Sequence, residues 1–468
     1  MPKQLHLAGF LIASQLTHSH AQWRHPRNDL NFLRPRFYEN IARILEHGKF
    51  EFAFFADVLC VPSTYGEGLK ESVRYGVQGA AALDPAYVVV MMAGVTRHLG
   101  LGITRSVTYY SPYDIARTFA TLDHLSNGRA AWNVVTSIND AEARNYGQER
   151  HLEHEARYER AEEFLELVYK LWGSWDDDAL IMDRASGLFA DPAKIRHIDH
   201  DGCWFKCDGP LSVPRSPQGR PAIMQAGSSD HGKDFAARWG EILFEIDPTA
   251  EGRRAYYDDV KSRLEKFGRS PEDCKIFPSV IPFIGETESI AREKQAFHNE
   301  LADPISGLIT LSSHLSHDFA QYSLDEPIQD LKINGVRGLY ELAVRLTKKG
   351  NLTLRDIGRL YAQGVLLPQV VGTPVQIADQ LEASFRNREV DGFIISPAYL
   401  PGAFEEFVQL VVPELQRRGL FHREYTGVTL RENLGLAKPS LTPPRDSIDV
   451  ESKANDEDAH PARLRNAQ

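Results

Sequence analysis

Cysteine is scarce in this chain, which has only four cysteines among its 468 residues. Cys203 and Cys207 stand close together, but no second cysteine pair or histidine pair follows at the spacing of a zinc site. The pattern therefore predicts reduced thiols and no metal site. Reduced thiols are in turn typical of a cytoplasmic protein.

Long apolar runs and an excess of positive charge are also missing. No run approaches the roughly 20 apolar residues that a transmembrane helix needs, and the N-terminal segment has no apolar core of the signal-peptide kind. The formal net charge is -11, which disfavours a general surface for nucleic acid or anionic lipid. We expect neither nucleic acid nor a membrane as a partner.

Several common site motifs are absent. Gly100-Leu101-Gly102 lacks the third glycine of a dinucleotide-binding turn and lies inside a predicted strand. The segment from His151 to His154 has the wrong spacing for a zinc protease helix. The chain also has no phosphate-binding loop ending in Gly-Lys-Ser/Thr and no Gly-x-Ser-x-Gly nucleophile turn.

Short apolar runs alternate with amphipathic stretches along most of the chain. This alternation predicts an α/β fold, specifically a (β/α)8 TIM barrel with insertions, of the bacterial luciferase-like kind once the resemblance below is considered. Two doubly wound domains are the alternative, which is disfavoured because no linker divides the first 430 residues. The eight predicted strands cover residues 5–12, 50–59, 99–104, 130–137, 221–226, 241–246, 275–284 and 391–396.

The predicted barrel occupies residues 1–436 as a single domain. We expect an irregular insertion near 175–220, with a short hairpin around Trp204, and a mostly helical insertion near 285–385. Residues 60–80 are expected to form a loop. The polar tail at 437–468 is expected to be disordered or to wrap a neighbouring subunit.

Polar side chains follow most of the predicted strands. Because the carboxyl ends of barrel strands converge, we expect these side chains to share one pocket. The alternative is that they only satisfy loop backbone groups. The residues concerned are His18, His20, Asp57, Thr104, Arg105, Asn133, Thr136, Ser137, Ser228 and Ser229.

Gly227-Ser228-Ser229 precedes a predicted helix and suits an anion, because small residues expose backbone N–H groups at a helix N-terminus. Arg157 and Tyr158 could reach the same anion. The alternatives are an ordinary serine N-cap and a solvated helix face. With several aromatic residues near the strand ends, the pattern suits a flat phosphorylated cofactor such as FMN, although a sugar-phosphate barrel fits the same pattern.

Longer segments resemble the luciferase-like flavin monooxygenases, in the group that contains the nitrilotriacetate and aromatic sulfone monooxygenases. The resemblance covers about residues 5–436. Its most specific part is Trp132-Asn-Val-Val-Thr-Ser137 followed by Asn139-Asp-Ala-Glu-Ala-Arg-Asn145, and Gly392-Phe-Ile-Ile-Ser-Pro-Ala-Tyr-Leu-Pro401 matches the sulfone-oxidising members. The resemblance implies reduced FMN (FMNH2), O2 as cosubstrate, a separate NAD(P)H-dependent flavin reductase and a homodimer or homotetramer.

The resemblance also assigns site residues. His18 and His314 are the catalytic candidates, either as hydrogen-bond donors or in proton transfer. Trp132 is expected to pack outward against helices. The cofactor-binding positions are Asp57, Thr104, Asn133, Ser137, Tyr158, Ser228 and Ser229. The substrate-lining positions are Phe10, Phe54, Phe244 and Val370, together with the two histidines.

The implied reaction is oxidation of an apolar organic substrate, with an aromatic sulfone cleaved at its C–S bond as the expected case. Arg105 is the main inward cation that we identify, which favours a neutral aromatic substrate. Residues 320–350 depart most from the sulfone-oxidising members. A halogenated aromatic, an alkyl sulfide or an aminopolycarboxylate are the alternative substrates, and a non-catalytic flavin-binding protein is the alternative class.

Overall fold

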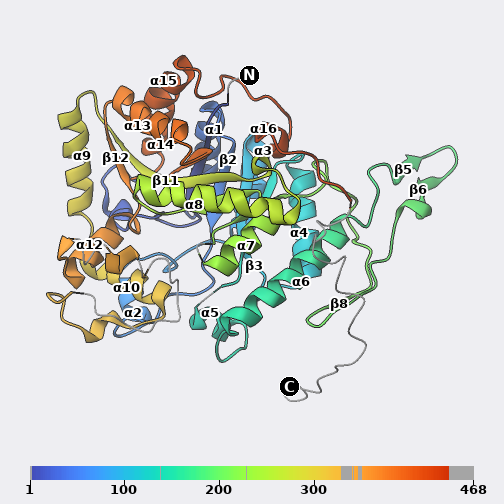
Figure 1. The fold of residues 1–468 in the computed structure, drawn as a ribbon, viewed down its shortest axis with the longest axis horizontal. Coiled ribbons are helices and arrows are strands. Elements are labelled where there is room, and N and C mark those ends of the chain that lie inside the picture. Colours follow the sequence, from blue (N-terminus) through green and yellow to red (C-terminus); the bar gives the residue numbers. More distant parts are fainter. Residues whose placement is uncertain are drawn as a thin grey trace.

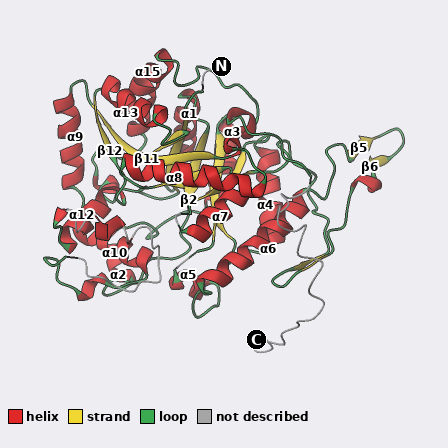
Figure 2. Cartoon of the chain, in the orientation of Figure 1, coloured by secondary structure: helices red, strands yellow, loops and turns green. Residues whose placement is uncertain are grey.

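Eight parallel strands form a closed barrel at the centre of the protein, with helices around it (Figures 1 and 2). The structure is a computed structural model that describes residues 3–137, 139–227, 229–327, 340, 342–345 and 350–441. The sheet closes where β10 pairs with β11. The predicted barrel is therefore confirmed. Its strands are β1 (His6–Ile12), β2 (Phe52–Ala56), β3 (Gly100–Ser106), β4 (Ala130–Val135), β9 (Ala222–Gln225), β10 (Ile242–Glu245), β11 (Lys275–Ile284) and β13 (Gly392–Ile395).

The outer helices begin at strong sequence signals. Proline is the first residue of several of them, where its missing N–H costs nothing. Asp84, Ser111 and Thr373 cap the helices that follow them through side-chain oxygens. The helices are α1 (Pro35–His47), α3 (Pro85–Val95), α4 (Pro112–Leu125), α5 (Asp140–Asn145), α6 (His154–Trp172), α7 (Asp230–Trp239), α8 (Ala250–Arg263), α13 (Pro374–Arg386), α14 (Gly402–Glu406) and α15 (Val412–Arg417).

The described residues of the insertion after β11 form helices, loops and one strand. It contains α9 (Glu288–Glu300), α10 (Pro304–Leu315) and α12 (Leu354–Gly364). Gly307 lets α10 approach α12, because a Cβ there would lie 1.9 Å from the carbonyl oxygen of Gly358. Sequence patterns missed β12 (Gln369–Gly372), which pairs with the second half of β11. The loop expected at 60–80 is also wrong in part, since α2 (Leu69–Tyr75) lies within it.

The insertion near 175–220 forms two hairpins. The one around Trp204, between β7 (His200–Asp201) and β8 (Lys206–Cys207), confirms the expectation. The other, between β5 (Leu180–Asp183) and β6 (Leu188–Ala190), extends away from the barrel (Figure 1). Of the predicted tail, residues 442–468 lie outside the described residues, and the carbonyl of Pro439 accepts a hydrogen bond from Arg215 in this insertion.

A short C-terminal helix, α16 (Leu430–Asn433), packs against the amino-terminal end of the barrel. Leu430 and Leu434 belong to the same apolar cluster as the side chains inside the barrel. Arg431, which is buried, donates to both carboxylate oxygens of Glu241 just before β10. α16 therefore covers the amino-terminal side of the barrel, opposite the strand ends that carry the predicted polar side chains.

Side chains alternate across the barrel wall because successive residues of a strand face opposite sides. On β4, Ala131 belongs to the interior cluster, whereas Trp132 belongs to the outer one. The ring of Trp132 lies 5.4 Å from Phe119 and 6.0 Å from Phe164, and its Nε1 donates to the carbonyl of Arg105. Trp132 thus packs outward, as predicted, and leaves Asn133 on the inner face.

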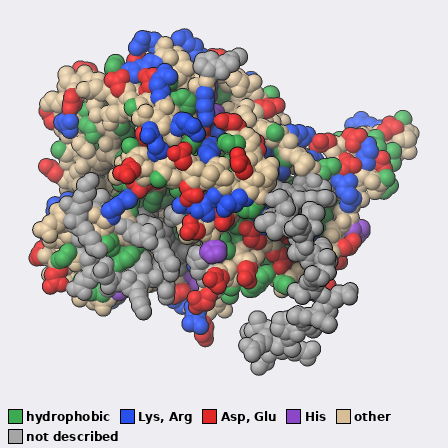
Figure 3. All heavy atoms as spheres, viewed as in Figure 1, with side chains coloured by type: hydrophobic (Ala, Val, Ile, Leu, Met, Phe, Trp, Pro, Cys, Tyr) green, Lys and Arg blue, Asp and Glu red, His purple; other side chains and the backbone are tan. Residues whose placement is uncertain are grey.

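Acidic and basic side chains are interspersed on the face of the molecule shown in Figure 3. Among the described residues, no helix is both long and apolar enough to cross a lipid bilayer. The same residues contain no group of three His, Cys, Asp or Glu side chains that could hold a metal ion.

The outward position of Trp132 predicts a large loss of stability on truncation. Replacing a fully buried tryptophan by alanine costs about 3–5 kcal/mol of unfolding free energy. We expect W132A to lower the urea midpoint accordingly. The matched control is W204A, since Trp204 is 40% exposed. Equal midpoints for the two variants would contradict this packing.

Candidate active site

Three phenylalanines and a histidine form an aromatic layer inside the barrel near the carboxyl ends of the strands. The rings of Phe54 and Phe244 are stacked with centroids 4.3 Å apart, and Phe10 meets Phe54 edge to face at 5.6 Å. His18, in the loop after β1, stacks on Phe10 at 3.6 Å. The barrel thus brings together four of the predicted substrate-lining residues, on β1, β2 and β10.

Thr104 and Asn133 form a polar wall on the neighbouring strands β3 and β4, which pair at these two residues. Asn133 Nδ2 donates to Thr104 Oγ1 at 2.9 Å, and Thr104 Oγ1 donates to the carbonyl of Phe55. Asn133 Oδ1 is buried and has no hydrogen-bond partner among the described residues. A buried acceptor of this kind is costly unless a ligand or water donates to it.

The end of β4 connects to the start of α6. Ser137 adopts a left-handed backbone, with φ of 54°, and its Oγ donates to Ser106 Oγ at 2.9 Å. Its carbonyl accepts a hydrogen bond from the guanidinium of Arg157. This bond holds Arg157 beside the strand end.

Arg157 is a buried cation with spare donor capacity. It is 8% exposed, and its Nε has no hydrogen-bond partner among the described residues. Burial lowers the pKa of the guanidinium, which means that its charge is incompletely compensated. An anion bound here would relieve this cost.

The N-terminus of α7 lies beside Tyr158. Ser229 caps this helix by accepting from the N–H of Gly232 at 3.1 Å. Tyr158 Oη is 3.1 Å from the position that a Cβ on Gly232 would take, and its hydroxyl interacts with Ser229. A phenol and a helix N-terminus therefore meet here, and Arg157 precedes Tyr158 on α6, a combination that suits an anion. Ser228 lies outside the described residues.

Asp57 and Arg105 form an ion pair beside this region. The Arg105 guanidinium lies 3.1 Å from Asp57 Oδ2 and also pairs with Asp84. Burial raises the pKa of the Asp57 carboxyl to about 6, although Arg105 opposes that rise. Because two carboxylates match Arg105, its charge is already compensated.

His18 and His314 are both half-buried and oriented by hydroxyl groups. His18 Nδ1 lies 2.9 Å from Ser396 Oγ, and His314 Nδ1 bonds the hydroxyl of Tyr361. Burial lowers the pKa of His18 to about 3, with a smaller contribution from His314, and lowers the pKa of His314 to about 4. Both rings are therefore neutral near pH 7, which favours hydrogen bonding over proton donation by an imidazolium.

Val370 lies apart from the aromatic layer. Val370 is on β12, where it pairs with Pro282 of β11. It belongs to the same apolar cluster as Ile284 and Ile377, outside the barrel interior. Sequence reasoning also missed Ser396 and Tyr361. Ser396 follows the last barrel strand, so the rule that strand ends converge could have found it. Tyr361 has no comparable signal, because it reaches His314 from the insertion.

Comparison with known proteins agrees with this geometry. The family model "Luciferase-like monooxygenase" matches residues 12–392. The chain belongs to the luciferase-like monooxygenases. A dibenzothiophene-sulfone monooxygenase of Rhodococcus erythropolis (strain XP) is 51% identical, over 94% of this chain and 98% of the relative.

This luciferase-like monooxygenase is also similar to a second relative in sequence and to a solved structure. Nitrilotriacetate monooxygenase component A of Aminobacter aminovorans is 42% identical, over 93% of this chain and 97% of the relative. A crystal structure of a riboflavin lyase with modified FMN and riboflavin superposes with a TM-score of 0.87 at 31% identity, covering 94% of this chain and 99% of that one.

Two fully buried histidines beside the site make stability depend on pH. His20 contacts Ser306, and His298 contacts Ser19. Burial lowers the pKa of each ring to about 3, whereas in the unfolded chain it is about 6.5. The unfolded chain therefore takes up protons that the folded chain does not, and stability falls as pH drops from about 6.5 toward 3.

We expect each of these histidines to contribute a slope of about 1.4 kcal/mol per pH unit between its two pKa values. Urea unfolding at several pH values between 4.5 and 6 measures this slope. The double variant H20Q/H298Q should show a flatter dependence than the parent, whatever its absolute stability. An unchanged slope would contradict the assignment.

Proposed function

We propose that this luciferase-like monooxygenase is an FMNH2-dependent enzyme that uses O2 to cleave an aromatic sulfone at its C–S bond. The observation that carries this proposal is the layer formed by Phe10, Phe54, Phe244 and His18 near the carboxyl ends of the barrel strands. Its stacked rings suit a flat neutral substrate. The 51% identity to a dibenzothiophene-sulfone monooxygenase supports the same substrate class.

The residues present fit reduced FMN. Arg157 Nε, Tyr158 and Ser229, together with Ser228, would hold the phosphate, and the unpartnered Asn133 Oδ1 would accept from the flavin or its ribityl chain, with Asp57, Thr104 and Ser137 alongside. Cleavage of a sulfone to a phenol and a sulfinate is redox-neutral overall. The four electrons that convert O2 into one phenol oxygen and one water therefore correspond to two equivalents of reduced FMN.

The chain's own residues would orient the substrate and exclude water. Phe10, Phe54 and Phe244 would enclose the aromatic rings of the sulfone. When Nδ1 of His18 accepts from Ser396 Oγ–H, the neutral ring carries its proton on Nε2. We propose that this N–H, and the corresponding one of His314, donate to the sulfone oxygens and hold the reacting carbon in place.

A separate NAD(P)H-dependent flavin reductase would supply FMNH2 in the cytoplasm. The name of the nitrilotriacetate relative includes "component A", which fits an enzyme system made of separate proteins. We also propose a homodimer or homotetramer. Exposed apolar side chains on the hairpin that extends from the barrel support this, namely Met182 and Phe189, which are 62% and 65% exposed.

Alkyl sulfides, halogenated aromatics and aminopolycarboxylates are the alternative substrates. An aminopolycarboxylate would need free cations in the site, whereas Arg105 already pairs with Asp57 and Asp84. A non-catalytic flavin-binding protein would hold oxidised FMN and form no oxygenated product.

Labelled oxygen tests the proposed reaction. The full chain is supplied with FMN, NADH, an unrelated flavin reductase and 18O2, and is offered a diaryl sulfone, an alkyl sulfide, a chloroaromatic or an aminopolycarboxylate in turn. We expect a hydroxyaryl sulfinate with one 18O atom on its phenol oxygen, seen by mass spectrometry. Labelled product from another substrate alone would overturn the sulfone assignment, and no labelled product from any would overturn the reaction class.

The anion end of the site gives a separate prediction on cofactor selectivity. A charge-assisted hydrogen bond contributes about 1.5–3 kcal/mol, so R157Q should weaken FMN binding by roughly tenfold or more. Riboflavin, which lacks the phosphate, should bind both forms equally. The matched control is R160Q on the same helix, since Arg160 contacts the carbonyl of Val107 and the ring of Phe205. Equal losses for both flavins would show that Arg157 does not contact the phosphate.

A further inference from the structure

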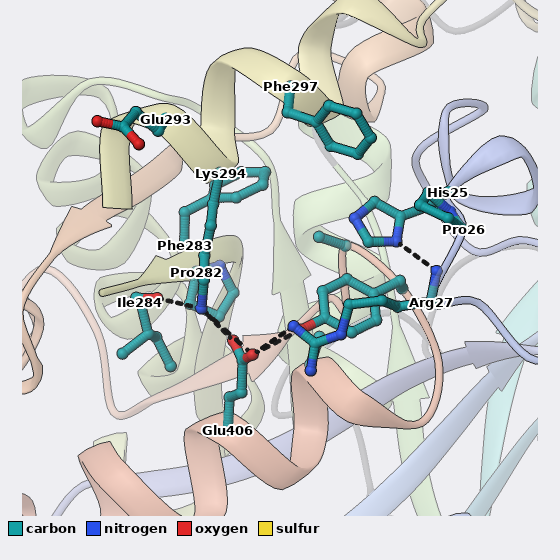
Figure 4. Close-up of a pocket in the computed structure, with 13 residues that line it drawn as sticks. His25, Pro26, Arg27, Pro282, Phe283, Ile284, Glu293, Lys294, Phe297 and Glu406 are labelled. Carbon is teal, nitrogen blue, oxygen red and sulfur yellow. Dashed lines mark hydrogen bonds and ion pairs between the residues drawn. The ribbon is translucent and has the colours of Figure 1, made fainter. Parts of the chain in front are cut away.

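A cavity of about 320 Å³ lies beside the barrel, between α9, the loop after β1 and α14 (Figure 4). Its volume is in the range of small-molecule sites. None of its lining residues belongs to the aromatic layer or the anion end of the candidate active site. It is therefore a separate compartment, next to the second half of β11.

Aromatic rings form one side of this cavity. His25 and Tyr399 are stacked with centroids 4.4 Å apart and planes 2° from parallel. Phe297, on α9, meets His25 edge to face at 5.6 Å and is 45% exposed. The edges of the stacked pair and the exposed ring of Phe297 provide apolar contacts for a planar ligand.

Two cations and two carboxylates line the polar part of the cavity, and only one of the carboxylates, Glu406, pairs with the cations. Glu406 pairs with Arg27 at 3.0 Å and with Lys294 at 3.2 Å, and it accepts from the hydroxyl of Tyr399 at 2.7 Å. Figure 4 shows these groups converging on the carboxylate, while Glu293 lies apart from them. The cluster of Arg27, Lys294 and Glu406 thus has a net positive charge.

A cationic ligand suits this arrangement poorly. The face of Tyr399 is already covered by the guanidinium of Arg27 at 4.7 Å, and the excess charge repels a further cation. An anionic group would instead complete the pairing of Arg27 and Lys294. The rings would hold its aromatic body.

We propose that this cavity, bounded by Tyr399, Phe297, Arg27 and Lys294, binds a planar aromatic carboxylate or sulfonate as a second ligand site. The anionic group pairs with the two cations, and the ring lies against the aromatic side of the cavity. The proposal rests on the residues that line this cavity, and it does not depend on which substrate the barrel oxidises.

Calorimetric titration of the full-length protein with 2-naphthoate tests the proposal, with neutral 2-naphthamide as the control ligand. We expect naphthoate to bind and the amide to bind at least tenfold more weakly. K294Q should weaken naphthoate binding several-fold. E406Q keeps the size of the side chain while removing its negative charge, and should tighten naphthoate binding.

Two further variants locate the bound ligand. R386Q removes a cation that pairs with Glu382 on the outer helix α13, and it should leave the affinity unchanged. F244A alters the barrel interior and should also leave it unchanged. The proposal is overturned if naphthoate does not bind, if the amide binds equally well, or if F244A weakens binding while K294Q and E406Q do not change it.

Discussion

β10 pairs with β9 on one side and with β11 on the other, and this pairing closes the parallel sheet into a barrel. Closure decides which side chains can meet. Residues at alternate positions of eight strands are forced toward one axis, and α16 covers the amino-terminal end through Leu430 and Leu434. The inward residues near the carboxyl ends therefore lie together on the side of the barrel opposite α16. Phe10 and Phe54 are paired on the neighbouring strands β1 and β2, whereas Phe244 on β10 reaches Phe54 only because the sheet closes.

Burial controls the protonation state of the two histidines in the candidate site. His18 and His314 stay neutral at pH 7 because burial disfavours their charged forms. Asn133 Oδ1 and Arg157 Nε remain without partners among the described residues. A buried polar atom without a partner costs free energy of folding unless a ligand or a water molecule forms a hydrogen bond with it. In the proposed function, these two atoms would contact the polar edge and the phosphate of one bound FMN.

Much of this arrangement follows from the sequence. The eight strands were predictable from their apolar runs, and the strand-end rule brought Thr104, Asn133, Ser137 and His18 to one end of the barrel. Alternation along β4 also predicted that Trp132 packs outward. Local patterns succeed here because each strand is buried on both faces and bounded by polar turns.

Long-range pairing explains what the sequence could not reveal. β12 has only four residues and becomes a strand because the free edge of β11 lies next to it. Its register places Val370 in the outer apolar cluster, away from the aromatic layer. Tyr361, on α12, orients His314 on α10. The two residues are 47 positions apart in the sequence, which is beyond the range of any local sequence pattern. Within the insertion, local patterns therefore missed β12 and the hydroxyl partner of His314, because both depend on contacts between residues far apart in the sequence.

A crystal structure of the protein with FMN tests the central claim most directly, namely that the strand ends form one flavin site. The account predicts the phosphate against Arg157, Tyr158 and the N-terminus of α7, with Asn133 in contact with the flavin and the aromatic layer beside its ring. FMN bound elsewhere, or with its phosphate away from Arg157, would contradict it.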